Sequence, residues 1–156
     1  MNQSEVLEAE KYQSMLVAIS RRAQEDFRRI YLDPQSGARR IKITKDEKWI
    51  EAHGTNEVDL ASLDYQGLPA DWQSERKIGA QIALDAVLDA VTKDESLDAS
   101  FIEKTAELLH DKWLERNSTR ATEIEKRQYE SLPENEKEKD RFFARAAVET
   151  YHAMGS

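Results

Sequence analysis

Tyr65-Gln66-Gly67-Leu68-Pro69 recurs 64 residues later as Tyr129-Glu130-Ser131-Leu132-Pro133, so the pattern Tyr-x-x-Leu-Pro occurs twice. At the same offset, Lys48-Trp49-Ile50-Glu51 matches Lys112-Trp113-Leu114-Glu115. Two of the three tryptophans and two of the three prolines therefore fall in register, which leaves chance as the weaker explanation. Similarity at a fixed offset predicts two structural units of one design.

Each copy has the same expected order: a helix with a tryptophan, a polar loop, the Tyr-x-x-Leu-Pro motif and a long helix. Proline suits the first position of a helix, so Leu68-Pro69 and Leu132-Pro133 predict two helix starts. The Tyr and Leu before each proline are expected to dock on the core as a hydrophobic staple does. We therefore expect units over residues 44–92 and 98–154, with aromatic rings along a groove between them.

An N-terminal helix is expected before the two units. Apolar residues at spacings of three and four predict it over residues 4–32, and Asp33-Pro34 ends it because the residue before a proline avoids the α conformation. The stretches 44–47 and 100–103 read as capping boxes, with Thr44 and Ser100 as the capping residues. Ile41 to Thr44 alternates like a strand, but without a partner run we expect no strands.

The composition favours helices. The chain has 156 residues, 39% hydrophobic and 35% charged, with only five Gly, three Pro and no Cys. It is too apolar for a disordered chain and too poor in turn formers for an all-β fold. We predict a single all-α domain over residues 1–156, a helical bundle of four long helices and one short helix.

The sequence also excludes several classes of function. Without cysteine there is no disulfide framework, thiol nucleophile, iron–sulfur cluster or cysteine zinc site. There is no Gly-x-Ser-x-Gly motif and no Gly-rich phosphate loop, so we expect a non-enzymatic protein without a cofactor. The N-terminal residues do not resemble a signal peptide and no apolar run could cross a bilayer, so we expect a cytoplasmic protein without a membrane partner.

The charge is unevenly distributed. The net charge of −8 argues against a nucleic-acid partner, which needs clustered Lys and Arg. Between Arg21 and Lys45, however, eight basic residues face three acidic ones, a net charge of +5, and the remainder carries −13. This segment is either a solvated face that pairs with the acidic remainder or an anion site, for which Arg39 and Arg40 are the candidates.

The segment from Glu107 to Met154 resembles the ryanodine-receptor repeat (RyR domain) family, which also occurs in bacterial and phage proteins. The matching residues are His110-x-x-Trp113 and Tyr129-x-x-Leu132, followed by Glu136-Lys137-x-x-Asp140-Arg141. The Gly-Trp-x-Tyr-Gly segment of that family is absent here, and the first copy lacks both the His and the Lys-x-x-Asp-Arg run. The resemblance implies paired repeats with pseudo-twofold symmetry, no catalytic residues, and binding of a small ligand, a nucleotide or a protein in the cleft.

These observations together predict a non-enzymatic RyR-like module that binds a small anionic or nucleotide-like ligand, or a partner peptide, between the units. The candidate ligand-binding residues are Trp49, Trp113, Tyr65, Tyr129, Arg141, Lys137, Arg39 and Arg40. For the aromatic residues the alternative is ordinary core packing, and for Arg141 it is a structural clamp. A purely structural or protein-interaction role is the corresponding alternative for the whole chain.

A di-metal site is a further alternative. Glu107-x-x-His110 and Glu149-x-x-His152 each place a carboxylate and an imidazole one helical turn apart, as in di-iron carboxylate bundles. Such a site also needs two inward-facing Glu residues on other helices. The apolar stripes of the other two long helices offer none, so the leading prediction contains no metal.

Overall fold

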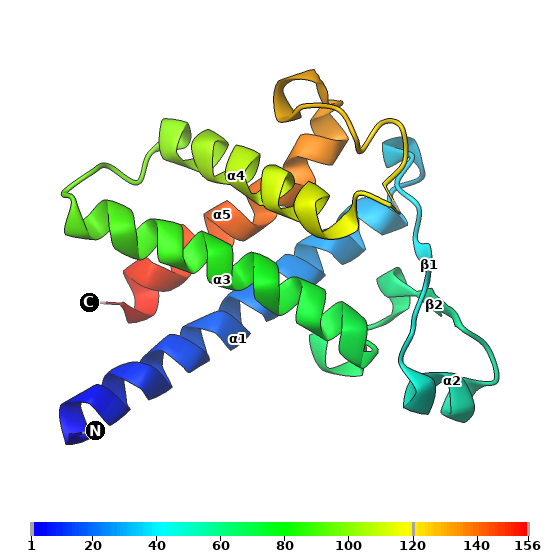
Figure 1. Ribbon diagram of the computed structural model, residues 1–156, viewed down its shortest axis with the longest axis horizontal. Coiled ribbons are helices and arrows are strands. Elements are labelled where there is room, and N and C mark those ends of the chain that lie inside the picture. The colour runs from blue at the N-terminus through cyan, green and yellow to red at the C-terminus, as the bar shows by residue number, and fades with distance from the viewer. Residues whose placement is uncertain (1, 120, 156) are drawn as a thin grey trace.

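The computed structural model describes residues 2–119 and 121–155 and confirms the all-α prediction. Within these residues there are four long helices and one short one (Figure 1). The helices are α1 (Gln3–Leu32), α2 (Glu47–His53), α3 (Ala70–Thr92), α4 (Ala99–Asn117) and α5 (Glu134–Met154). None of the helices in the described part of the chain is long and apolar enough to span a bilayer.

The core forms where α1, α3, α4 and α5 meet. Helix α5 packs against all three of the others, and α1 also packs along α3 (Figure 1). The predicted stripe of α1 is buried at Met15, Leu16, Ile19, Ala23 and Phe27, whereas the first turns of this helix are exposed. Asp33 leaves the helical conformation before Pro34, so α1 ends where the sequence indicates.

The prediction of no strands is wrong, because the structure contains one pair of short strands. Strand β1 (Ile41–Ile43) pairs antiparallel with β2 (Glu57–Asp59), and Lys42 lies opposite Val58. Val58 is the only apolar residue of β2 and is fully buried, so β2 has too little alternation to be recognised from its sequence.

The residues that cap α2 and α4 also differ from the prediction. Asp46, not Thr44, caps α2 by accepting the amides of Lys48 and Trp49, and Asp98, not Ser100, caps α4. The other carboxylate oxygen of Asp46 accepts the Ala70 amide at 2.8 Å, at the start of α3. This bond to Ala70 is the largest cause of the lowered pKa of Asp46. One carboxylate therefore serves two helix starts, and the Thr44 hydroxyl is left to bind Asp71 at 2.6 Å.

The two Tyr-x-x-Leu-Pro motifs have the same local backbone. Each begins as a short 3₁₀ turn, η3 (Tyr65–Gly67) and η4 (Tyr129–Ser131), in which the leucine amide donates to the tyrosine carbonyl at 3.2 and 3.0 Å. Pro69 and Pro133 have φ, ψ of −57°, 155° and −58°, 153°, and each lies one residue before its helix rather than at its first position.

The units around these motifs are unequal. The first unit has a tryptophan helix, α2, of 7 residues, whereas its counterpart α4 has 19. Helix α2 lies beside the two strands at one end of the molecule, while α4 packs on α5 (Figure 1). Trp49 and Trp113 are therefore in different surroundings, because a seven-residue helix cannot cover the bundle as α4 does.

Helices α3 and α5 approach closely at Gly79. A Cβ at this position would lie 2.7 Å from Cζ of Phe143, less than a van der Waals contact. The Phe143 ring also packs against Phe27 of α1, with the ring centroids 5.7 Å apart. The absence of a side chain at position 79 thus lets three helices meet around one aromatic ring.

We predict that Gly79→Ala destabilises the protein by about 1–3 kcal/mol in urea unfolding, because the added methyl group displaces the Phe143 ring. Helix propensity alone predicts the opposite, a gain of up to about 1 kcal/mol. Ser74→Ala, on an exposed position of the same helix, is the control. The cost of Gly79→Ala should shrink in a Phe143→Leu background, and a gain in stability from Gly79→Ala contradicts the prediction.

Candidate functional site

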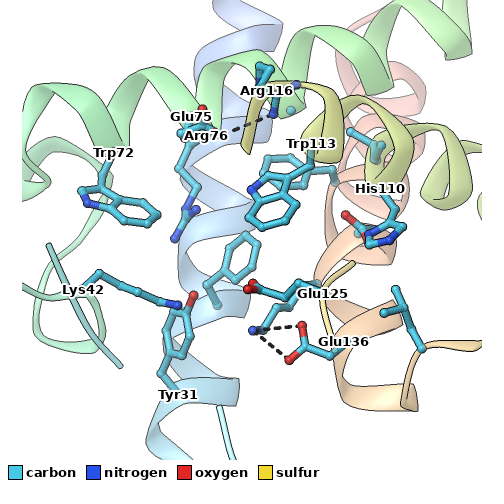
Figure 2. A pocket seen from close by; sticks show the side chains of 17 residues that line it. Tyr31, Lys42, Trp72, Glu75, Arg76, His110, Trp113, Arg116, Glu125 and Glu136 are labelled. Carbon is cyan, nitrogen blue, oxygen red and sulfur yellow. Dashed lines mark hydrogen bonds and ion pairs between the residues drawn. The ribbon is translucent and has the colours of Figure 1, made fainter. Parts of the chain in front are cut away.

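A pocket of about 120 Å³ lies between α3 on one side and α4 and α5 on the other, with α1 beneath them (Figure 2). One water needs about 10–15 Å³ of such space, so the pocket has room for several. Its walls are largely aromatic, with Phe27 and Tyr31 from α1, Trp72 from α3, Trp113 from α4 and Phe143 from α5.

Arg76 is the most unusual residue of this pocket. Its side chain extends from α3 between the indoles of Trp72 and Trp113 (Figure 2), and only 5% of the residue is exposed. The guanidinium carbon lies 4.0 Å from the centroid of the Phe27 ring, a cation–π contact. The buried Nη2 has no hydrogen-bond partner among the described residues. A buried donor without an acceptor costs about 1–3 kcal/mol, so an acceptor placed here would be stabilising.

Arg76 is held by Gln24, a fully buried residue of α1. Nε of Arg76 donates to Oε1 of Gln24 at 2.9 Å, while Nε2 of Gln24 donates to the carbonyls of Leu60 and Leu63, each at 2.9 Å. Burial lowers the pKa of Arg76, and the charge and hydrogen bonding of the Tyr31 phenol, together with the charge of Glu75, act in the opposite direction. A guanidinium nevertheless keeps its proton in proteins, so the pocket contains a positive charge.

Lys42 brings a second positive charge to the pocket. The indole N–H of Trp72 donates to the carbonyl of Ile43 at 3.2 Å and so anchors β1 beside α3. Lys42, the preceding residue, reaches the pocket near Tyr31 (Figure 2). Lys42 forms no ion pair with any residue in the described ranges.

The opposite wall carries His110 and Asp140. His110 is buried, and its Nε2 donates to the carbonyl of Arg127 at 2.7 Å. Its Nδ1 faces Asp140 Oδ2 at 3.9 Å, beyond hydrogen-bond distance. The pKa of Asp140 is raised well above its ordinary value, chiefly by burial and secondly by the nearby carboxylate of Glu136. The neutral form of this carboxyl is thus favoured in the folded protein.

The remaining charges of the lining are mostly paired. Arg116 lies 3.3 Å from Glu75, and Lys139 lies 3.4 Å from Glu136. The carboxylate of Glu125 accepts the Thr122 amide at 2.9 Å. Arg76 and Lys42 are therefore the basic groups of the pocket that lack a carboxylate partner in the described part of the chain.

The structure places Trp113 in the pocket and the other aromatic candidates outside its lining. Trp49 stacks on His53 at a centroid distance of 3.9 Å on α2. Tyr65 is half-buried against the main core, and Tyr129 is buried in a small second cluster with Ala106 and Leu132. The prediction of one groove that contains all four rings is therefore not what the fold produces.

The charged candidates also lie outside the lining. Arg40 forms two hydrogen bonds to Asp59, at 3.0 and 2.7 Å, and Arg39 is exposed. Lys137 lies 3.6 Å from Glu134 and over the Tyr129 ring.

Arg141 has the geometry of a structural clamp. Its guanidinium bonds to Glu103 of α4 and to Glu134 and Glu138 of α5. The Tyr129 hydroxyl also donates to Glu103, at 2.8 Å, so the clamp ties η4 and α5 to α4. With its donors on three carboxylates, Arg141 has little capacity left for a ligand.

The residues of the di-metal alternative do not converge. His110 faces the pocket, Glu107 is exposed, Glu149 pairs with Arg22 at 2.8 Å, and His152 is exposed near the end of α5. Within the described residues, no three acidic, His or Cys side chains are placed to hold a metal ion.

Sequence reasoning missed Trp72, Arg76 and Lys42. The sequence does indicate Trp72 and Arg76, because they share one face of α3 with Gly79, Ala80 and Ala83, at spacings of three and four residues. An arginine on an apolar face is unusual and could have been singled out. No such signal marked Lys42, because its position depends on the unrecognised strand pair.

The raised pKa of Asp140 predicts how stability varies with pH. Because the folded-state pKa lies above the unfolded one, stability falls as pH rises from about 4 through the folded pKa. Asp140→Asn stays neutral, so its melting temperature should exceed that of the parent protein by a few degrees at pH 7. This difference should vanish below about pH 4. Glu51→Gln, on exposed α2, is the control, and equal melting temperatures of Asp140→Asn and parent at pH 7 contradict the prediction.

Comparison with known proteins assigns neither a family nor a function to the chain. The chain matches no family model, no curated protein and no solved structure. The resemblance to the ryanodine-receptor repeat therefore stays a prediction that rests on the residues quoted for it. The function has to be argued from the pocket itself.

Proposed function

We propose that this chain is a non-enzymatic binding module for a small anionic ligand, which occupies the pocket between α3 and helices α4 and α5. The observation that carries the proposal is Arg76, a buried guanidinium with a free donor inside an aromatic pocket. A ligand oxygen at the pocket edge of the guanidinium would supply a counter-charge. A small movement of the neighbouring side chains would let it also accept from Nη2, which is buried in the structure. Charge-assisted bonds of arginine to carboxylate or phosphate are among the strongest hydrogen bonds in proteins.

The location agrees with the sequence prediction in one respect, because it lies between the two expected units. The long helix of the first unit, α3, contributes Arg76 and Trp72, and α4 of the second contributes Trp113. The +5 segment contributes Lys42 rather than Arg39 or Arg40. We propose no reaction, because the groups that face the ligand position are suited to binding.

Arg76→Met tests the proposal. Ligands that bind the folded state raise its melting temperature, so a panel of acetate, benzoate, inorganic phosphate and AMP should contain at least one stabilising anion. The shift should be lost in Arg76→Met, which replaces the apolar stem of the arginine with an unbranched chain but removes the guanidinium and its charge.

Arg39→Met, an exposed arginine outside the pocket, is the matched control and should retain the full ligand-induced shift. Circular dichroism checks that Arg76→Met keeps its helices. The proposal is wrong if no anion of the panel shifts the melting temperature, or if the shift is the same in Arg76→Met as in the parent.

A further inference from the structure

The size of the pocket limits its ligand to a small molecule. Pockets that enclose drug-sized ligands measure about 300–1,000 Å³, whereas this one measures about 120 Å³. A protein cavity of about 150 Å³ accepts benzene. This pocket is slightly smaller than that cavity but is partly open to solvent, so a single ring with a short substituent is the largest ligand that it can mostly enclose. A nucleotide, with its base, sugar and phosphate, is too large to be enclosed.

The charges of the pocket favour a ligand with one negative charge. Among the described residues Arg76 and Lys42 lack carboxylate partners, but the carboxylates of Glu75, Glu125 and Glu136 also line the pocket, beside Asp140, whose pKa is raised. A di- or triphosphate would bring several negative charges close to these groups. A monoanion needs only one guanidinium, and Arg76 supplies one that forms no ion pair in the described part of the chain, whereas Glu75 and Glu136 pair with Arg116 and Lys139.

The shape of the pocket favours a planar ligand. The indoles of Trp72 and Trp113 lie on opposite sides of the Arg76 guanidinium (Figure 2). Aromatic rings prefer stacked or edge-to-face contacts with other rings, and every neighbouring helix of the pocket supplies at least one ring. A flat ring that extends from a carboxylate at Arg76 into the pocket can make such contacts with the surrounding rings.

We infer that the pocket binds a planar aromatic monocarboxylate, with its carboxylate on Arg76 and its single ring against the aromatic side chains that line the pocket. This inference rests on the proposed function and narrows it to one class of ligand. Benzoate is the simplest member of this class.

Isothermal titration of the unaltered chain with matched ligands tests the inference. Benzoate should bind about tenfold more tightly than each of four comparison ligands, because each lacks one required feature. Benzamide lacks the charge, cyclohexanecarboxylate lacks the planar ring, acetate lacks any ring, and AMP exceeds the space. This series does not depend on the folding of any variant.

Substitution of the tryptophans gives a second measurement. Trp113→Leu should weaken benzoate binding about tenfold and leave acetate binding unchanged, because only ring contacts are lost. Trp72→Leu should weaken benzoate binding at least as much, because it also loses the hydrogen bond of the indole to Ile43. Trp49→Leu, on α2 and outside the pocket, is the matched control. In a Trp49→Phe background, benzoate should change the fluorescence of the two remaining tryptophans, both of which line the pocket.

The outcomes separate this inference from the proposed function. The inference is overturned if benzamide, cyclohexanecarboxylate or AMP binds as tightly as benzoate, or if neither pocket tryptophan matters. Binding of acetate or phosphate without benzoate overturns the inference but leaves the proposed function standing. Both the inference and the proposed function are wrong if no anion binds, or if benzoate binds Arg76→Met as tightly as it binds the parent protein.

Discussion

The hydrogen bond between Gln24 and Arg76 is the constraint on which the rest of the pocket depends. Gln24 lies fully buried on α1 and uses its amide group on two carbonyls of the 60–63 turn and on Arg76 of α3. Buried polar networks of this kind fix one arrangement of the chain, because any other arrangement leaves their members unpaired. The same bond holds the guanidinium at the pocket and leaves Nη2 unused.

A buried arginine with an unused donor is costly unless something compensates for it. In this chain the Phe27 ring at 4.0 Å covers the guanidinium and Gln24 accepts from Nε, but no carboxylate within the described residues pairs with it. Replacing such a group by an apolar one is often neutral or stabilising. Arg76 thus differs from Arg141, which forms ion pairs with three carboxylates and ties α4 to α5.

Helices were predictable from sequence because periodicity is a local property. The ends of α1 and the shared backbone of the Tyr-x-x-Leu-Pro motifs follow from residues within a few positions of one another. The errors arise where distant segments meet: Asp46 caps Ala70, and β1 pairs with a strand that has one apolar residue. The pocket also depends on distant segments, because Arg76 is held in place by Gln24, which lies 52 positions earlier in the chain. Among the ligand-binding candidates that the sequence indicated, Trp113 is the one that lines the pocket.

Repetition in the sequence did not produce repetition of the site. The two motifs set the same turn before α3 and α5, yet the preceding helices have 7 and 19 residues, and only α4 is long enough to wall the pocket. The first unit instead gives Trp72 and Arg76 of its long helix, and the second gives His110, Trp113 and Asp140 on the opposite wall. A pair of equal units would present two similar surfaces to each other. Because these units are unequal, one pocket forms between them, with Arg76 on one side and Trp113, His110 and the buried Asp140 on the other.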